Sequence, residues 1–151
     1  DELKSRGVKR AEVTLHVGID TFRPIGTEKI DEHAMHSEWC AVPEETVAAV
    51  RRTQQLSGRV VAVGTTAVRS LETAAKIGTA ESYVGATDLY IRPGYSFCAV
   101  DGMLTNFHMP RTTLMVLVSA FAGHDLIRHA YQEAVRTGYR FLSYGDAMLI
   151  L

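Results

Sequence analysis

The fold is indicated most clearly by the stretch Arg59-Val60-Val61-Ala62-Val63-Gly64-Thr65-Thr66-Ala67-Val68-Arg69. Residues 59–64 are rich in β-branched side chains and almost continuously apolar, which is typical of a strand covered on both faces. A short polar turn follows, and a helix is expected over about 67–76. Since a strand, a turn and a helix in this order are the signature of an α/β fold, we predict an α/β domain.

Further elements are expected on both sides of this unit. The predicted strands cover residues 12–17, 37–42, 88–91, 103–105 and 147–151, and the predicted helices cover residues 3–6, 43–58, 112–122 and 125–137. The helix over 112–122 is apolar nearly all round, so we expect it to be buried. The alternation of strands and helices favours parallel neighbours, and the lack of repeats or linkers predicts a single domain over residues 1–151.

Length and composition argue against several classes of protein. The chain has 151 residues, of which 46% are hydrophobic and 22% charged, and this balance is typical of a globular domain rather than a disordered chain. No apolar run approaches the ~20 residues that cross a bilayer, so we expect no membrane partner. Two cysteines, Cys40 and Cys98, are too few for a disulfide framework and favour the cytoplasm. Because the sequence begins at Asp1 rather than Met, we expect it to be part of a longer chain.

The charge is distributed unevenly, although the net charge is only −1. Residues 46–71 contain no acidic residue but four arginines, which are Arg51, Arg52, Arg59 and Arg69. The planar guanidinium group suits phosphate and carboxylate partners. On charge alone, however, we interpret this run as a solvated helix face, since the chain as a whole lacks the basic excess typical of nucleic-acid binders.

The turn between the strand and the helix is the first candidate site. The N-terminus of a helix presents unpaired N–H groups, so residues 63–66 are a possible anion site to which Arg69 would add a cation. In the alternative interpretation Thr65 or Thr66 simply caps the helix. The sequence has neither the Gly-Lys-Ser/Thr of a Walker loop nor a G-x-G-x-x-G stretch, so nothing predicts a nucleoside triphosphate or a dinucleotide.

Several histidines are candidates for proton transfer or for holding loops. His33, His36 and Cys40 invite a zinc hypothesis, but their spacing fits no strong metal pattern, and we predict no metal. Asn106 and His108 lie where a strand passes into the buried helix. They either contact a ligand there or hold the loop through its backbone.

Asp146 in the last turn has two possible roles, and so do the aromatic side chains in the predicted loops. Asp146 immediately precedes the final strand, where its carboxylate either binds a ligand or anchors a turn. The aromatic side chains in predicted loops either stack on a base or cover the core, and they are Phe22, Tyr95, Phe97, Phe107 and Tyr144.

Six stretches, taken together in their order along the chain, indicate a family more specifically than any one of them does alone. They are Val13-Thr14-Leu15-His16-Val17-Gly18 with Thr21-Phe22-Arg23-Pro24, His33-Ala34-Met35-His36-Ser37-Glu38, Val63-Gly64-Thr65-Thr66 continuing to Val68-Arg69 and Leu71-Glu72, Pro93-Gly94-Tyr95 with Phe97, residues 105–111, and residues 143–150. In this combination the chain resembles the S-adenosylmethionine:tRNA ribosyltransferase-isomerase family of queuosine biosynthesis. One departure is Asp20, which stands where the family usually has glycine.

The resemblance implies both a fold and a reaction. Family members are similar to a distorted α/β barrel with an inserted small β-barrel domain. We expect this chain to be the C-terminal portion of the large domain, without the N-terminal segments and the insert. The implied reaction moves the ribosyl part of S-adenosylmethionine onto 7-aminomethyl-7-deazaguanine at the wobble position of a tRNA anticodon. It gives epoxyqueuosine and releases adenine and methionine. S-adenosylmethionine is a substrate here, and no cofactor is implied. The alternative is a truncated, non-catalytic fragment that binds a ligand or a partner chain.

The resemblance also suggests roles for individual residues. A base must remove a proton beside the sulfonium, and the candidates are His16, His36 and His108, with Glu38 or Asp146 as alternatives. Thr65, Thr66 and Arg69 are expected to hold a carboxylate or a phosphate, Asn106 to read a base, and Tyr144 or Phe22 to stack on one. Arg51, Arg52 and Arg59 are expected to contact the anticodon arm of the tRNA. The missing N-terminal half of the enzyme is a further expected partner.

Overall fold

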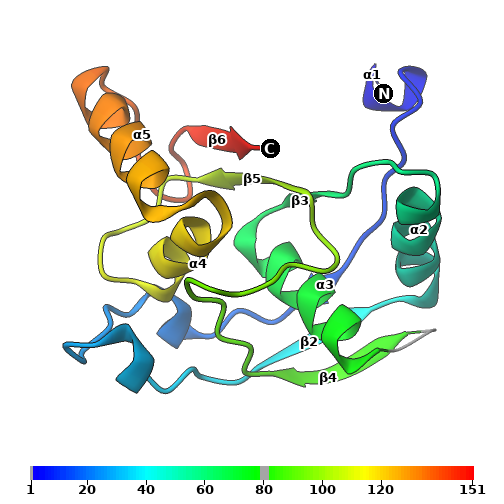
Figure 1. Cartoon of the computed structure of the whole chain (residues 1–151), viewed down its shortest axis with the longest axis horizontal. Coiled ribbons are helices and arrows are strands. Elements are labelled where there is room, and N and C mark those ends of the chain that lie inside the picture. The colour runs from blue at the N-terminus through cyan, green and yellow to red at the C-terminus, as the bar shows by residue number, and fades with distance from the viewer. Residues whose placement is uncertain (1, 79–81) are drawn as a thin grey trace.

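The computed structural model describes residues 2–78 and 82–151. It is a mixed α/β structure, which confirms the predicted fold class. Two three-stranded sheets lie on either side of the helix α3 (Thr65–Ile77), with one sheet above it and one below it in Figure 1. Both sheets therefore use the same helix to cover one of their faces.

The first sheet has the strand order β1-β2-β4 and is antiparallel throughout. Its strands are β1 (Thr14–Leu15), β2 (Glu38–Val42) and β4 (Tyr83–Thr87). Along β2, Glu38, Cys40 and Val42 are buried, while the alternate residue Trp39 is exposed. This period of two places the buried residues on the face that covers α3.

The second sheet has the order β3-β5-β6 and is mixed. β3 (Val61–Val63) runs parallel to β5 (Gly102–Asn106), and β5 runs antiparallel to β6 (Ala147–Ile150). Val63 pairs with Leu104, and Leu104 pairs with Leu149. These three side chains therefore project from the same face of the sheet, and all three are exposed.

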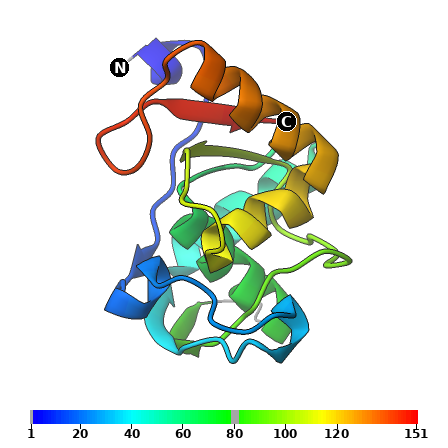
Figure 2. The same ribbon diagram turned by 90° about the vertical axis from the view of Figure 1, so that its left-hand side faces the viewer.

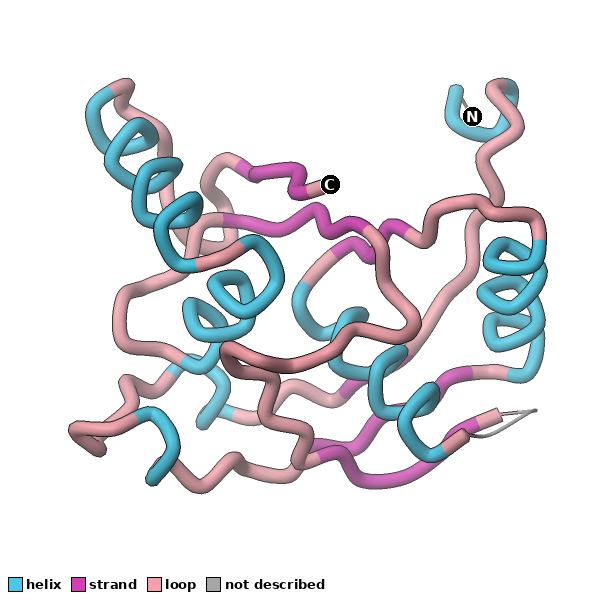
Figure 3. The backbone as a smooth tube through the Cα atoms, viewed as in Figure 1, coloured by secondary structure: helices cyan, strands magenta, loops and turns pink. Residues whose placement is uncertain are grey.

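The remaining helices pack around the two sheets. α2 (Glu44–Gln55) begins after Pro43, and α4 (Thr113–Ala122) is followed directly by α5 (His124–Arg136). Short 3₁₀ turns, η1 (Ile19–Phe22) and η2 (Ile30–Glu32), interrupt the long connection between β1 and β2, which is mostly loop in Figure 3. The short α1 (Glu2–Ser5) stands away from the sheets near the N-terminus in Figure 1, and it lies at the top of the molecule in Figure 2.

The core lies between the sheets and these helices. Its largest fully buried apolar side chains are Val42, Val68, Ile91, Met103 and Val118. Every residue of α4 is buried or half-buried, so the expectation of a buried helix over 112–122 is confirmed. Among the residues that the model describes, none of the helices has the length and apolarity that a membrane span requires.

Four details of the sequence-based prediction are wrong. The strand predicted over 88–91 lies at Tyr83–Thr87 instead, and the one predicted over 12–17 is only Thr14–Leu15. Most neighbouring strands are antiparallel, and β3∥β5 is the single parallel pair among the described strands. The strand of residues 59–64 is not covered on both faces, since Val63 remains 70% exposed. A continuous apolar run shows only that neither side carries charge, and it does not show that another layer covers both sides.

Candidate functional site

The carboxyl ends of β3 and β5 meet at one edge of the second sheet, which we call the carboxyl edge. Gly64 and Thr65 follow β3 there, and Asn106 ends β5. Because β6 is antiparallel, it begins at this edge, where Ala147 pairs with Asn106 and Asp146 precedes it. The structure thus brings Thr65, Thr66, Asn106 and Asp146 to the same edge of the sheet. In α/β sheets, ligands bind outside the carboxyl ends of parallel strands.

Gly64 shapes the start of α3 at this edge. It is the N-cap residue, with φ 93° and ψ 143°, a conformation in which a side chain would be strained. No side chain makes a capping hydrogen bond, so the alternative in which Thr65 or Thr66 serves as the cap is wrong. The first N–H groups of α3 therefore lack a side-chain acceptor, while Thr65 is buried and Thr66 half-buried beside them.

Asn106 and Asp146 hold the last turn of the chain. The Nδ2 atom of Asn106 donates to the carbonyl oxygens of Gly145 and Asp146, at 3.4 and 3.3 Å. The Asp146 carboxylate accepts from the backbone N–H of Arg140 at 2.7 Å and from its guanidinium group. These bonds from Arg140 lower the pKa of Asp146. Asp146 thus makes the turn-anchoring contacts that were one of its two predicted alternatives.

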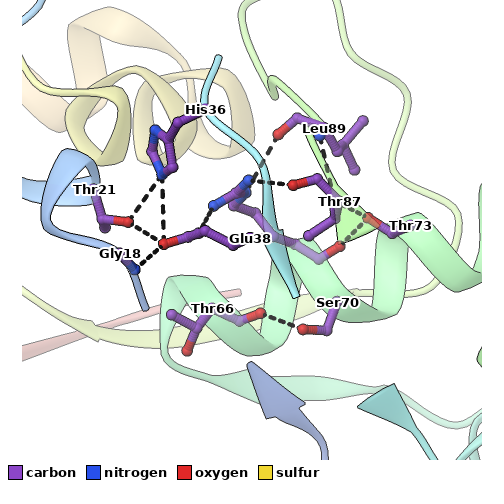
Figure 4. Close-up of polar contacts among 10 residues, drawn as sticks. Gly18, Thr21, His36, Glu38, Thr66, Ser70, Thr73, Thr87 and Leu89 are labelled. Atoms are coloured by element: carbon purple, nitrogen blue, oxygen red, sulfur yellow. Dashed lines mark hydrogen bonds and ion pairs between the residues drawn. The ribbon is translucent and has the colours of Figure 1, made fainter. Parts of the chain in front are cut away.

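A buried polar group, which we call the Glu38 cluster, lies along α3 one turn beyond Thr65. It consists of Gly18, Thr21, His36, Glu38 and Arg69 (Figure 4). The Oε1 atom of Glu38 accepts from Gly18 N–H at 2.7 Å and from Thr21 Oγ1 at 2.5 Å, and Oε2 accepts from Arg69. The Nε2 atom of His36 lies 3.1 Å from Thr21 Oγ1 and 3.4 Å from Glu38 Oε1.

The guanidinium N–H groups of Arg69 donate to acceptors inside the protein. Besides Glu38, its guanidinium group contacts the carbonyl oxygens of Leu89 and Thr87, at 3.3 and 3.4 Å. Burial would raise the pKa of Glu38, but the hydrogen bonds from Thr21 and Gly18 and the charge of Arg69 outweigh it and lower that pKa. Glu38 is therefore ionised at neutral pH, and Arg69 neutralises it.

His108 is buried two residues beyond the carboxyl edge. Its Nε2 atom lies 3.0 Å from the Thr105 hydroxyl, and its backbone N–H donates to the Tyr131 hydroxyl at 2.7 Å. Burial lowers the pKa of His108 to about 4, so the ring is neutral at physiological pH. The neighbouring Phe107 packs against three aromatic rings, those of Tyr131, Tyr139 and Phe141.

Other predicted residues lie away from both groups or at their margin. His16 packs against Trp39, which is exposed on the outer face of the first sheet, with ring centroids 4.6 Å apart and the rings tilted by 44°. Phe22 is exposed beside Thr21, and Tyr144 is 98% exposed on the last turn. The three arginines expected to bind tRNA are exposed on α2 or just before β3, and they are Arg51, Arg52 and Arg59.

Sequence reasoning assigned no role to Glu72, which the structure shows to be fully buried. Its carboxylate accepts from the backbone N–H groups of Cys98, Ala99 and Val100 and from the Tyr95 hydroxyl. It thereby fixes the loop that leads into β5. The available signal was its spacing, because Glu72 follows the buried Val68 by four residues and so shares its helix face.

Two hollows of the described chain lie apart from most of the candidate residues. A cavity of about 250 Å³ lies between α2 and α3 and is lined mainly by apolar side chains, with Arg51 the one predicted residue among them. A second, open hollow lies against Pro43, Glu44, Glu45 and Ala48. Within residues 2–78 and 82–151, no group of three or more His, Cys, Asp or Glu side chains is arranged to hold a metal ion.

Comparisons with known proteins agree with the resemblance. The chain is 56% identical over 151 residues to an S-adenosylmethionine:tRNA ribosyltransferase-isomerase of Thermotoga maritima, covering all of this chain and 45% of the relative. It is 57% identical over 149 residues to the protein of the same name from Cupriavidus pinatubonensis, covering 98% and 43% of the two chains. The crystal structure of an S-adenosylmethionine tRNA ribosyltransferase from Thermotoga maritima superimposes with a TM-score of 0.83 at 51% identity, over 99% of this chain and 47% of that one.

The chain spans less than half the length of the relatives that it matches. The match nevertheless extends over almost all of its own residues. Residues 1–150 match the family of queuosine biosynthesis proteins, and this chain belongs to that family.

Proposed function

We propose that this chain carries the chemical groups of an S-adenosylmethionine:tRNA ribosyltransferase-isomerase. In this reaction the ribosyl part of S-adenosylmethionine passes to 7-aminomethyl-7-deazaguanine at the wobble position of a tRNA in the cytoplasm, giving epoxyqueuosine. The observation that carries the proposal is the meeting of Thr65, Thr66 and Asn106 at the carboxyl edge, beside the Glu38 cluster. The names of the relatives support the same reaction.

The N-terminus of α3, where no side chain accepts from the first N–H groups, suits the carboxylate of S-adenosylmethionine. An anion gains from the N–H groups of the first helical turn and from the positive end of the helix dipole. Gly64 lets the strand enter the helix without placing a side chain between those N–H groups and a ligand. The hydroxyls of Thr65 and Thr66 add donors beside them. Arg69 acts from one turn away, by holding the Glu38 carboxylate.

The proposed chemistry needs no metal ion. The positive sulfur of S-adenosylmethionine stabilises a carbanion on the carbon next to it, so a side chain of ordinary basicity can remove a proton there. The departing adenine needs a hydrogen-bond donor or a proton. In this proposal Asn106 and the exposed rings of Phe22 and Tyr144 contact the adenine or the modified base.

Arg51, Arg52 and Arg59 supply the surface for the tRNA in this proposal. They occupy a stretch of the chain without acidic residues, and all three are exposed. Contacts of arginine with phosphates provide most of the affinity of such complexes and little of the sequence specificity.

The second sheet fits a partner that covers its open face. Val61, Val63, Leu104 and Leu149 form an apolar surface on this face, and Val63 and Leu149 are 70% and 57% exposed. Contiguous apolar surface of this kind marks an interaction site. Since the relatives are more than twice as long as the matched region, we propose that the remaining part of the family polypeptide packs here. The two parts would together form the distorted barrel.

Release of adenine tests the function. The substrates are S-adenosylmethionine and an anticodon stem–loop that carries 7-aminomethyl-7-deazaguanine. The chain is assayed alone and as a reconstituted pair, in which it is mixed with the remaining part of the Thermotoga maritima relative. We expect adenine release that depends on the stem–loop, and greater release from the reconstituted pair. Adenine release from neither sample would overturn the proposal and favour the non-catalytic alternative.

A further inference from the structure

We propose that His36 is the proton acceptor of the transfer reaction, and that Thr21 and Glu38 hold its ring as the Nε2–H tautomer with the lone pair on Nδ1. The choice of tautomer follows from the geometry of the Glu38 cluster alone. The role as base rests, in addition, on the proposed function. Glu38 and Arg69 become positioning residues in this account.

The tautomer follows from counting hydrogens in the cluster. The Glu38 carboxylate is ionised, so it only accepts hydrogen bonds. Thr21 has one hydroxyl hydrogen, which it donates to Glu38 Oε1 over 2.5 Å. Thr21 Oγ1 then has only lone pairs left for His36 Nε2, 3.1 Å away. Both oxygens near Nε2 are thus acceptors, and Nε2 must carry the hydrogen.

A neutral imidazole with its hydrogen on Nε2 has its lone pair on Nδ1. Figure 4 shows the second ring nitrogen on the side of the ring away from Thr21 and Glu38. In the described part of the chain Nδ1 makes no hydrogen bond to the protein. The His36 side chain is 15% exposed, whereas that of Glu38 is 1% exposed.

The other candidates for the base are less suited. Glu38 is the most buried of them, and its two oxygens already accept hydrogen bonds from Gly18, Thr21 and Arg69. His108 is enclosed in the core, where burial lowers its pKa to about 4 and weakens it as a base. Asp146 is engaged by Arg140. The ring of His16 packs against Trp39 on the opposite face of β2 from Glu38.

The proton balance of the step is simple. The C–H bond next to the sulfonium breaks, its electron pair stays on carbon beside the positive sulfur, and the proton goes to His36 Nδ1. The imidazolium that forms lies 3.4 Å from the Glu38 carboxylate, which stabilises the added charge. The carbanion pair then forms a C=C bond to the adjacent ring carbon, the bond from that carbon to the ring oxygen breaks, and its electron pair forms a C=O bond to the carbon that carries adenine. The bond from this carbon to adenine breaks, and adenine leaves with the electron pair of that bond and takes the proton from Nδ1. His36 is then neutral again.

Nitrogen NMR of the chain itself tests the tautomer without any substrate. The histidine rings are labelled with ¹⁵N and observed at pH 7.5. We expect His36 to show a protonated Nε2 and an unprotonated Nδ1, without averaging between tautomers. Thr21→Val should weaken this preference, because only the Glu38 carboxylate then remains as an acceptor near Nε2, whereas Thr21→Ser, which keeps the hydroxyl, should retain it in full. A hydrogen on Nδ1, on both nitrogens, or exchanging between them would overturn the assignment.

Adenine release by the reconstituted pair tests the role as base. His36→Gln should lower the rate at saturating substrates at least about 100-fold, the usual contribution of a general base, with little change in KM. Imidazole added to His36→Ala should restore part of the rate, which a structural role would not allow. His129→Gln on the exposed face of α5 is the matched control and should retain full activity.

The two measurements separate the two proposals. An unchanged rate in His36→Gln, with an active wild type, would refute His36 as the base and leave the proposed function intact. An inactive wild type would instead refute the proposed function, and with it the role as base, whereas the NMR result would still decide the tautomer.

Discussion

Glu38 on β2 and Arg69 on α3 form an ion pair with side chains that are only 1% and 3% exposed. The pair joins the first sheet to the helix that both sheets share, and the carbonyl oxygens of Thr87 and Leu89 surround the guanidinium group. Taking two charges out of water is costly, so such a pair persists only where additional hydrogen bonds satisfy both partners. Gly18 and Thr21 supply these bonds to Glu38, and they also bring the loop after β1 to His36.

Replacing Glu38 tests how much this ion pair contributes to the stability of the fold. Glu38→Gln leaves the Arg69 charge buried without a counter-charge, and we expect the free energy of unfolding to fall by about 3–5 kcal/mol. Urea denaturation followed by circular dichroism measures this change. Glu44→Gln removes an exposed carboxylate from the first turn of α2 and should cost much less. Equal losses in the two variants would contradict the assignment of Glu38 as a buried anchor.

The buried His108 predicts a pH dependence of stability. Its pKa is about 4 in the folded chain and 6.5 as an ordinary histidine, so the unfolded state binds the proton first as the pH falls. The titration of His108 leaves the free energy of unfolding unchanged above pH 6.5. As the pH falls from 6.5 toward 4, it lowers the free energy of unfolding by roughly 3 kcal/mol at most. Urea denaturation at pH 7.5, 6.5 and 5.0 measures it.

His108→Gln is the matched variant for this prediction, because its amide retains a hydrogen-bonding group for Thr105 but does not titrate. The free energy of unfolding of this variant should then change less between pH 6.5 and 5 than that of the wild type. Because the pKa of Glu38 is lowered, this carboxylate takes up its proton only below that window. If wild type and His108→Gln lost the same stability over that window, His108 would not be the group responsible.

Glu72 is expected to control the loop before β5. Glu72→Gln keeps the size of the side chain but replaces an acceptor oxygen with an NH₂ group. The backbone N–H groups that now donate to the carboxylate would then face another donor. We expect faster hydrogen exchange at the amides of Cys98, Ala99 and Val100, by about tenfold or more if at least 1.4 kcal/mol of local stability is lost.

The same variant has a second readout at Tyr95. Burial, together with the negative charge of Glu72, raises the pKa of the Tyr95 hydroxyl. In Glu72→Gln that pKa should fall, which an ultraviolet titration of tyrosinate records. Glu45→Gln on the exposed start of α2 is the control for both readouts. Unchanged exchange and an unchanged tyrosine titration would show that the carboxylate does not hold the loop.

The arginines near α2 predict how tRNA binding depends on salt. If Arg51, Arg52 and Arg59 each contact a phosphate, their joint replacement by alanine should flatten the plot of log affinity against log salt by roughly 2 to 3 units. Binding of the anticodon stem–loop at several salt concentrations gives the slope. A control triple variant at Arg6, Arg10 and Arg128 removes the same charge from other exposed positions. Equal slopes in the two variants would exclude a specific role for the α2 arginines.

The sequence predicted best those features that depend on local pattern. The strand, glycine and helix of residues 61–77 were foreseen because β-branched residues, Gly64 and the apolar spacing of α3 all favour the same structure. The apolar helix α4 followed from local pattern as well, because its residues are apolar nearly all round.

Features that depend on long-range pairing were not foreseen. Nothing local in residues 83–91 distinguishes a strand at Tyr83–Thr87 from one over 88–91, because the register is set by pairing with β2. Arg69 looked like a free cation for a ligand, since its partner Glu38 lies 31 positions away in the sequence. Thr21 gained significance only when folding placed its hydroxyl between Glu38 and His36.

The central claim is that the carboxyl edge and His36 form one site for S-adenosylmethionine. Its most direct test is a titration of S-adenosylmethionine into the reconstituted pair, with isotope label only in this chain. The account predicts saturable NMR shift changes at Thr65, Thr66, Asn106 and His36, while Val47 and Val50 in the cavity between α2 and α3 stay unchanged. Shift changes confined to that cavity, or none at the carboxyl edge, would contradict it.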